Sequence, residues 1–138
     1  MNDLKNVLDT YDNLNNYSPI IKISYGTTSF LFTGDAEESV EKEVLNNFSN
    51  ITSDVLKIGH HGSSTSTSET FLNKVNPKIT VISVGKYNIY GHPTEETLEK
   101  LRNTTIYRTD LDGTIQIISD GQTNEIVKID VNFDSSQM

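Results

Sequence analysis

Four side chains that could take part in chemistry lie in loops that directly follow apolar runs of the chain. They are Asp35, His60, His61 and His92. Carboxylates and imidazoles bind metal ions and transfer protons. Each apolar run before them is typical of a β-strand, and loops at the carboxyl ends of strands meet at one edge of a layered α/β sheet. The sequence therefore predicts that these four side chains form one site.

Each of these residues also has a plain structural interpretation. Asp35 suits the N-cap of a helix at 36–48, where Glu38 would complete a capping box, although a capping carboxylate can still direct one oxygen at a metal ion. His60 and His61 are equally typical of a solvated loop. The glycines on either side of this pair instead favour a tight backbone and a functional loop.

Further polar residues lie close to the histidines in the sequence. Ser63, beside Gly62, is a candidate contact for a phosphate group, while the serines that follow it favour caps and loop solvation. His92 is preceded by a Tyr-Gly pair, an unusual approach to a helix. The segment TDLDG at 109–113 resembles part of a calcium loop, but its spacing is too short for one and favours a β-turn.

The pattern of apolar residues predicts one α/β domain with the element order ββαβαβαβββ. Strands are predicted at 20–25, 29–33, 54–59, 78–85, 105–109, 113–119 and 125–131. Helices are predicted at 36–48, from a capping box at Ser66 and Glu69 through Val75, and at 95–101 behind an N-cap at Thr94. The predicted organisation is a lead-in segment at 1–15, the domain at 16–131 and a frayed tail at 132–138.

Composition removes several classes of function. The chain has 138 residues, which suits one domain, and no cysteine, which excludes a disulfide framework, a thiolate metal site and a cysteine nucleophile. Its 19 acidic and 11 basic residues give a net charge of −8, opposite in sign to most free-standing nucleic-acid binders. No apolar run reaches the roughly 18 residues that a membrane-spanning helix needs.

Four motifs in order then resemble a known family. They are TGDAE at 33–37, LKIGHHGSSTS at 56–66, ISVGKYNIYGHP at 82–93 and YRTDLDG at 107–113. Together they look like the carboxyl-terminal half of a metallo-β-lactamase-fold domain, of the subgroup found in the ComEC-type competence proteins. The resemblance covers about 16–131, nearly the whole chain.

The resemblance implies a fold and a chemistry. The fold is an αββα sandwich, of which this chain would be the second half only, a mixed sheet with flanking helices. The family usually holds one or two metal ions, most often zinc or manganese. These ions activate a water that attacks a phosphodiester or another ester.

The resemblance also implies roles for single residues. Asp35 matches the family's bridging aspartate and His61 a metal ligand, while His60 would face the substrate phosphoryl group; the order of the two histidines stays open. His92 resembles a downstream histidine that binds substrate or protonates the leaving group. The pocket would be lined by Ser63 and Tyr90.

One departure from the family pattern is decisive for the expected function. The main metal motif, His-x-His-x-Asp-His, is absent, and no histidine precedes His60. Asp35 and His61 are two metal ligands, whereas a zinc site needs at least three. We therefore expect part of a metal-dependent phosphodiesterase or nuclease-like hydrolase, related to competence and DNA uptake, that is inactive alone and holds no metal tightly.

Two other functions stay open on the sequence. One is a non-catalytic structural or interaction module derived from the fold, and the other is a metal-independent binder of a small ligand. Half a sandwich would expose an apolar face, so the expected partner is the missing amino-terminal half or a second copy of the chain. A phosphodiester or nucleic acid is the expected substrate. The expected location is the extracellular face if the chain is part of a competence protein, and otherwise the cytoplasm.

Overall fold

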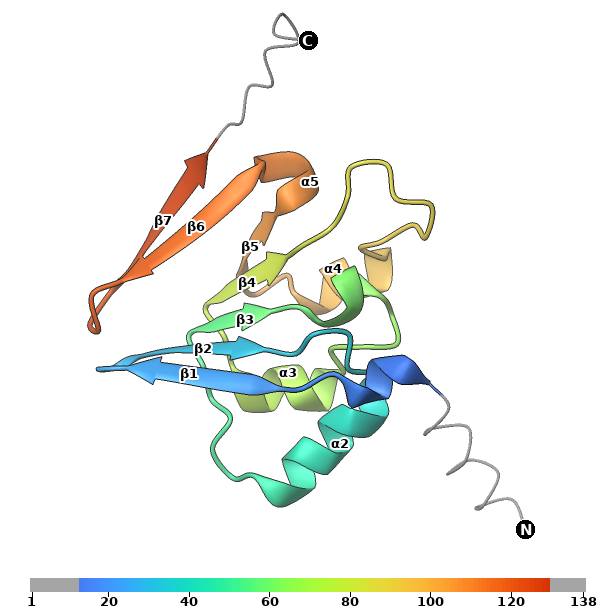
Figure 1. Cartoon of the computed structure of the whole chain (residues 1–138), viewed down its shortest axis with the longest axis horizontal. Helices are drawn as coiled ribbons and strands as arrows, with labels where there is room; N and C mark the ends of the chain where they lie inside the picture. The colour runs from blue at the N-terminus through green and yellow to red at the C-terminus, as the bar shows by residue number, and fades with distance from the viewer. Residues whose placement is uncertain (1–12, 130–138) are drawn as a thin grey trace, which may run out of the picture.

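The computed structural model describes residues 13–129. Its centre is a mixed sheet with the strand order β1-β2-β3-β4-β5 (Figure 1). The strands are β1 (Ile21–Tyr25), β2 (Thr28–Phe32), β3 (Val55–Lys57), β4 (Ile79–Ile82) and β5 (Thr105–Arg108). β1 and β2 form an antiparallel hairpin, and β2 to β5 run parallel to one another. The carboxyl ends of β2, β3 and β4 therefore meet at one edge.

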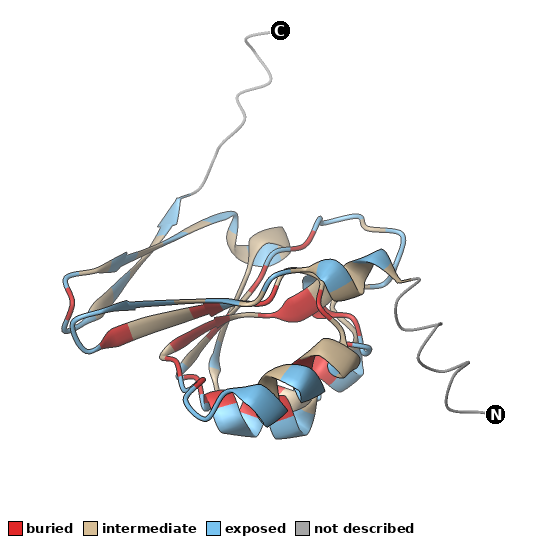
Figure 2. Ribbon diagram, turned by 60° about the horizontal axis from the view of Figure 1, so that its bottom comes forward, coloured by how far each residue is buried: buried red, intermediate tan, exposed pale blue. Residues whose placement is uncertain are grey.

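Helices cover one face of this sheet. They are α2 (Glu38–Asn47), α3 (Glu69–Val75) and α4 (Glu95–Lys100), and the 3-10 turns η1 (Leu14–Tyr17) and η2 (Gly59–Gly62) lie at the carboxyl edge. The core fills the space between sheet and helices, where Figure 2 shows buried positions concentrated. Leu31, Leu56 and Ile82 come from the sheet, and Phe71 and Leu101 come from the helical side. Burying this apolar surface is the main force that holds the two layers together.

A second hairpin lies over the opposite face. It consists of β6 (Thr114–Ser119) and β7 (Asn124–Ile129), and it follows the one-turn helix α5 (Thr109–Asp112). Its turn is fixed to the β1–β2 turn, because the Thr27 amide donates to the Gly121 carbonyl at 2.7 Å. Gly26 has a φ of +57°, and a Cβ built on it would lie 2.1 Å from the Gly121 oxygen. A residue with a side chain does not fit at this contact.

The face between the sheet and this hairpin is apolar and incompletely filled. A cavity of about 400 Å³ separates the two layers and is lined by Phe30, Phe32, Val81, Ile115 and Ile117, among others. Beyond the hairpin the same face is open. Ile21, Ile23 and Tyr25 are exposed there. The sheet is therefore closed by helices on one side, and on the other it is covered only where the second hairpin lies.

The predicted element order is confirmed, and so is the mixed α/β class. The hairpin at 20–33, the helix at 95–101 and the Thr94 cap all appear, with the Thr94 hydroxyl accepting from the Thr97 amide. TDLDG forms the one-turn helix α5 in place of the predicted β-turn. Of the predicted end segments, residues 1–12 and 132–138 lie outside the described part of the chain.

Two capping predictions are wrong. α2 begins at Glu38 behind Glu37, so Asp35 is not its N-cap and no capping box forms with Glu38. α3 is capped by Ser68, whose hydroxyl accepts from the Phe71 amide, and not by Ser66. In both cases the loop before the helix bonds to other parts of the molecule, which moves the helix start later than local sequence suggests.

Candidate functional site

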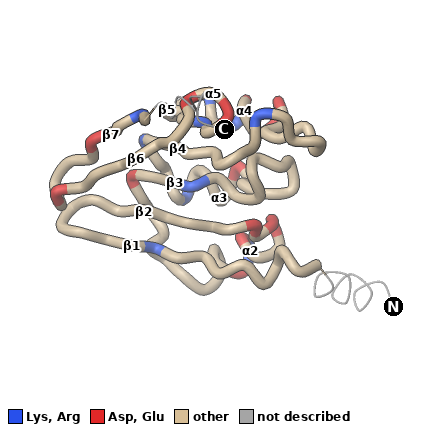
Figure 3. The backbone as a smooth tube through the Cα atoms, turned by 45° about the horizontal axis from the view of Figure 1, so that its top comes forward, with Lys and Arg blue, Asp and Glu red and all other residues tan. Residues whose placement is uncertain are grey.

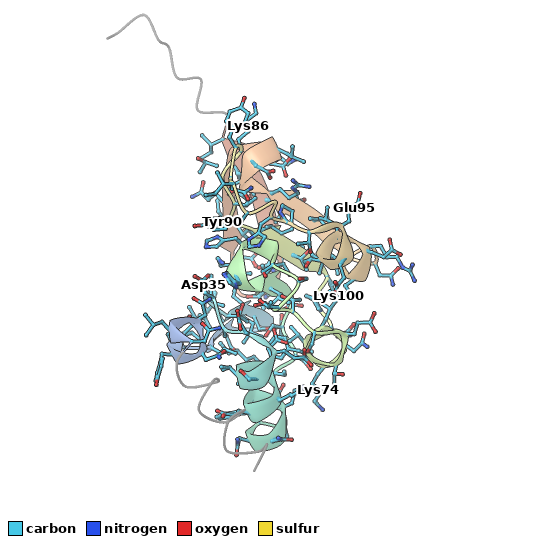
Figure 4. The ribbon with its side chains drawn as sticks, turned by 90° about the vertical axis from the view of Figure 1, so that its right-hand side faces the viewer. Asp35, Lys74, Lys86, Tyr90, Glu95 and Lys100 are labelled. Atoms are coloured by element: carbon cyan, nitrogen blue, oxygen red, sulfur yellow. The ribbon has the colours of Figure 1, made fainter. Side chains whose placement is uncertain are left out.

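The structure brings the four predicted side chains together at the carboxyl edge of the sheet. Asp35 follows β2, His60 and His61 follow β3, and His92 lies in the connection after β4. The His61 Nε2 atom lies 3.5 Å from Asp35 Oδ1. The His60 ring centroid lies 5.7 Å from that of His92 and 6.4 Å from that of His61. Figure 4 views this edge, with Asp35 and Tyr90 labelled.

The loop that carries the two histidines has an unusual backbone. His60 and His61 have φ values of 46° and 55°, the left-handed region that residues with a side chain rarely adopt. The His60 amide donates to the Gly34 carbonyl at 3.0 Å, which ties the loop after β3 to the loop after β2. A Cβ at Gly62 would lie 2.5 Å from Pro93 Cβ, so glycine is required there. Such strain is kept where the surrounding structure holds it in place, often at functional sites.

The orientation of His61 is set by its other ring nitrogen. His61 Nδ1 lies 2.6 Å from the Ser83 carbonyl oxygen, which can only accept, so Nδ1 carries the proton. The other ring nitrogen, Nε2, then faces Oδ1 of Asp35 at 3.5 Å. A proton or a metal cation between these two atoms would stabilise their approach. Asp35 and His61 thus have the arrangement of two ligands of one cation.

His60 is held by a residue that the sequence analysis missed. Glu37 Oε1 lies 3.5 Å from His60 Nδ1 and accepts from the Thr65 hydroxyl at 3.1 Å. Its other oxygen accepts from the Asn13 side-chain amide at 2.8 Å. Glu37 stands two residues after Asp35 in the same TGDAE motif. That spacing was the available signal, since it places both carboxylates where β2 gives way to α2.

His92 contacts two other rings. Tyr90 stacks on it with ring centroids 5.9 Å apart and an interplanar angle of 30°, while His60 meets it edge-on. Partial burial lowers the pKa of His92 below its ordinary value of 6.5, and the charges of His60 and His61 lower it further. His92 is therefore neutral at pH 7 in the free protein. In that state its imidazole offers one donor and one acceptor nitrogen.

The side chain of Ser63, the predicted phosphate contact, points toward other residues of its own loop. Ser63 is 6% exposed, and its hydroxyl lies 3.0 Å from the Thr65 hydroxyl. The Thr65 hydroxyl in turn lies 3.5 Å from His60 Nδ1. Ser63 thus reaches the site through Thr65 in this structure, and a direct role in binding substrate stays a prediction.

A buried carboxylate supports the histidine loop from behind. Glu41 of α2 is 1% exposed, and it accepts from the backbone amides of Thr67 and Ser68, the second at 2.9 Å. The Thr67 hydroxyl accepts from the Gly59 amide at 3.3 Å, just before the histidines. Sequence periodicity gave no signal for this residue, because an acidic side chain on a surface helix is expected to face water.

Lys57 supplies positive charge beside the site. It ends β3, and its Nζ donates to the Ile58 carbonyl at 3.2 Å. Burial lowers the pKa of Lys57 below 10.5, and the charge of Asp35 acts in the opposite direction. The carboxylate of Asp35 thus lies in the field of a partly buried cation.

The described residues form no complete metal centre. Within residues 13–129, no group of three or more His, Cys, Asp or Glu side chains is placed to hold a metal ion. Asp35 and His61 form a two-residue pair, fewer than the three ligands that zinc requires. In the same range no helix has the length and apolar character needed to cross a membrane.

Comparison with known proteins agrees with the motifs at this edge. The chain is 47% identical over 104 residues to ComE operon protein 3 of Bacillus subtilis (strain 168), a match covering 74% of this chain and 13% of that protein. It is 39% identical over 105 residues to competence protein ComA of Neisseria gonorrhoeae, covering 74% and 15%. It is 36% identical over 105 residues to recombination protein 2 of Haemophilus influenzae (strain ATCC 51907 / DSM 11121 / KW20 / Rd), covering 75% and 13%.

These relatives are much longer than the region they share with this chain, which spans 13% to 15% of their length. No solved structure matches the chain. The family model of the metallo-beta-lactamase superfamily matches residues 10–86, more than half of the 138 residues. The match includes β2, β3 and the loops that carry Asp35, His60 and His61. The chain therefore belongs to the metallo-beta-lactamase superfamily, in a form related to competence proteins.

Proposed function

We propose that this chain supplies part of the active site of a metal-dependent phosphodiesterase or nuclease-like hydrolase. The observation that carries the proposal is the Asp35–His61 pair. The Ser83 carbonyl accepts from His61 Nδ1, which turns Nε2 toward Asp35, 3.5 Å from Oδ1. Two ligands held in this way by separate loops suit one cation whose remaining ligands lie outside the chain.

The surroundings of the two histidines support different roles for them. Asp35 and His61 are proposed as metal ligands. His60 is held through Nδ1 by Glu37 and Thr65, which leaves its Nε2 for a substrate phosphoryl group. His92, neutral at pH 7 and in contact with His60, is proposed to hydrogen-bond the substrate.

The substrate class is inferred from the relatives. One of them is named for competence and another for recombination, which favours a nucleic-acid phosphodiester. The net charge of −8 argues against tight binding through phosphates alone. Figure 3 shows the Lys and Arg positions scattered along the chain, without a continuous basic stripe in the described part. Local positive charge would come from Lys57 and from the bound metal.

One partner, a neighbouring layer of a longer protein, would both supply the remaining metal ligands and cover the open face of the sheet. The apolar face that carries Ile21, Ile23 and Phe32 is exposed beside the 400 Å³ cavity. A neighbouring layer of a longer protein would bury this face and bring the remaining ligands to the edge of the sheet. The chain would then be the second half of an αββα sandwich.

A second function has one observation in its favour. The described residues form no metal-binding group of three, so the fold could serve as a non-catalytic interaction module. Under this alternative the left-handed backbone of His60 and His61 is a structural feature with no chemical role. Activity in the completed domain separates the two functions.

The test supplies, as a separate chain, an amino-terminal half-domain of the superfamily that carries His-x-His-x-Asp-His. Hydrolysis of bis-p-nitrophenyl phosphate with manganese or zinc is expected in the mixture and not in the chain alone. Asp35→Ala and His61→Ala should each remove it, while Glu99→Gln, on the exposed side of α4, should not. Activity that persists when Asp35, His60 and His61 are all replaced would refute the proposal.

Metal content of the 138-residue chain tests the ligand count without activity. After dialysis we expect less than one equivalent of zinc or manganese per chain, because two ligands are too few. One tightly held equivalent that is lost in both Asp35→Ala and His61→Ala would show that the chain completes the site by itself.

A further inference from the structure

The connection between β4 and α4 presents large apolar side chains to solvent beside the site. Tyr87 is 88% exposed, Ile89 is 89% exposed and Tyr90 is 75% exposed. Exposed apolar residues are common one by one, but three within four positions of one loop are a concentrated surface. None of them contributes to the core. Because these side chains lie next to His92, we expect them to bind a ligand that reaches the site.

The loop that presents them has a defined shape. The Asn88 side-chain amide donates to the Gly85 carbonyl at 3.1 Å and to the His92 carbonyl at 2.7 Å. The Asn88 side-chain oxygen accepts from the His92 amide at 2.9 Å. Asn88 thus bonds to both ends of the loop, so the rings between them are held out from the surface. A prearranged surface loses less conformational entropy on binding than a flexible one.

The rings continue directly into the site. Tyr90 stacks on His92, and His92 meets His60 with centroids 5.7 Å apart. In the view of Figure 4, Tyr90 lies between Lys86 and Asp35. A chain bound at the Asp35–His61 pair would therefore extend its neighbouring units over Tyr90 and toward Tyr87.

We propose that Tyr87 and Tyr90 form a stacking platform for the nucleobases that flank the phosphodiester at the site. This inference rests on the proposed function and names the part of the substrate that the loop recognises. Planar bases stack on tyrosine whatever their sequence, and stacking needs no positive charge. That matches a chain of net charge −8 whose loop has a single cation, Lys86, with its Nζ 5.9 Å from the Tyr87 ring centroid.

The same charge pattern disfavours a lipid surface as the occupant. Recognition of an anionic membrane draws on clusters of Lys and Arg near the apolar side chains. Residues 85–92 contain one Lys and no Arg. A loop inserted in lipid would also bring the bilayer against His92, which adjoins the site.

The experiment measures binding separately from hydrolysis. The full 138-residue chain, in chelator, is titrated with a short thymidylate oligomer and with an abasic oligomer of equal length, following the tyrosine ring resonances by NMR. The thymidylate oligomer is expected to bind roughly tenfold or more tightly, because stacking contributes about 1–3 kcal/mol per base. Its affinity should depend weakly on salt, because stacking makes few contacts with phosphates. For a single strand, each phosphate contact adds roughly −0.7 to the slope of log K against log salt concentration.

Variants distinguish stacking from general apolar contact. Tyr87→Ala with Tyr90→Ala should lower the affinity to that of the abasic oligomer, and Tyr87→Leu with Tyr90→Leu should do nearly the same. Tyr87→Phe with Tyr90→Phe should keep the affinity. The matched control is Phe48→Ala, which removes another exposed ring, 60% exposed, at the end of α2.

Two affinity results would contradict the proposed platform. One is an equal affinity of the chain for the abasic and the thymidylate oligomers. The other is an unchanged affinity for the thymidylate oligomer in the Tyr87→Ala, Tyr90→Ala variant. Binding to phosphatidylglycerol vesicles that needs Tyr87, with no preference for the thymidylate oligomer, would assign the loop to a membrane. The proposed function is tested by hydrolysis in the completed domain, and the platform is tested by the affinity difference between the two oligomers in chelator, so the two can fail separately.

Discussion

At the scale of single residues, the partner of each side chain decides its chemistry. His60 and His61 are adjacent and identical in type, yet their Nδ1 atoms face different groups. His61 donates to the Ser83 carbonyl, whereas His60 faces Glu37 and the Thr65 hydroxyl. A carbonyl oxygen can only accept, so it fixes the proton of His61 on Nδ1, and the groups that hold His60 through Nδ1 are side chains instead. Adjacent histidines can thus serve as a metal ligand and as a substrate contact.

His92 should titrate below the ordinary histidine pKa of 6.5, because burial and the two other imidazoles disfavour its charged form. The unfolded chain then takes up its proton first as the pH falls. The free energy of unfolding should decrease as pH falls below 6.5 toward the lower pKa of the folded state. A pH titration of the ring protons by NMR checks this, and His60→Ala should move the pKa of His92 upward. A pKa at or above 6.5 in the unaltered chain would contradict the assignment.

Replacing Glu41 by Gln should destabilise the protein by about 1–3 kcal/mol, since a buried acceptor is lost. The carboxylate accepts from two consecutive backbone amides, and the amide group of Gln would place a donor against one of them. Urea unfolding measures the loss, with Glu43→Gln on the exposed side of α2 as the control. The ring resonances of His60 and His61 should also shift, because the Thr67 hydroxyl links this contact to Gly59. Equal stability of the two variants would exclude the supporting role.

At the scale of elements, three parallel strands position the site, and one glycine contact holds the second hairpin over the sheet. β2, β3 and β4 are neighbours in the sheet, so the loops after them lie side by side. The β6–β7 hairpin is held over the sheet by its turn, where Thr28 and Ser119 hydroxyls lie 2.6 Å apart and Gly26 meets Gly121. This contact joins segments more than ninety positions apart in the sequence.

Gly26→Ala should lower stability by about 2 kcal/mol or more. The left-handed φ of +57° costs an L-residue roughly 1–2 kcal/mol, and the added Cβ would lie 2.1 Å from the Gly121 oxygen. Gly85→Ala is the control, because nothing lies within 4 Å of a Cβ at that position. Thermal or urea unfolding compares the two. An equal loss of stability in Gly26→Ala and Gly85→Ala would show that the contact between the β1–β2 turn and the β6–β7 turn does not stabilise the protein.

At the scale of the whole molecule, the chain has one closed face and one open face. Helices bury Leu31, Leu56 and Ile82 on the first. On the second, Ile23 is 52% exposed and Phe32 is 39% exposed. An apolar face of this kind is covered in most proteins, and without a cover it favours association.

In isolation the chain should therefore associate with itself through the open face. Size exclusion with light scattering is expected to give a dimer or a larger oligomer. Ile23→Lys should shift the protein toward the monomer, because a charge in the contact opposes burial. Phe48→Lys, at an exposed position of the opposite side, should leave association unchanged. A compact monomer for the unaltered chain would count against this interpretation of the face.

The order of elements and the grouping of the site residues were predictable from local pattern. Alternating and continuous apolar runs identify strands through the period of two along a strand, and Thr94 caps its helix through a bond three residues away. Asp35, His60, His61 and His92 each follow such a run, and parallel strands bring their loops to one edge. The family could be recognised for the same reason, since its motifs occupy these loops.

Tertiary structure alone decided what each of these residues contacts. Local sequence favoured Asp35 as a cap, but α2 starts behind Glu37, whose carboxylate is bonded to Asn13 and Thr65. Glu41 is buried because it accepts hydrogen bonds from backbone amides of the histidine loop. Those amides are far from Glu41 in the sequence, so the residues around Glu41 do not predict its burial. The sequence by itself determined which strands form and which loops follow them. Long-range hydrogen bonds and the left-handed backbone at His60 then decided the direction of each side chain, because those bonds join segments far apart in the chain.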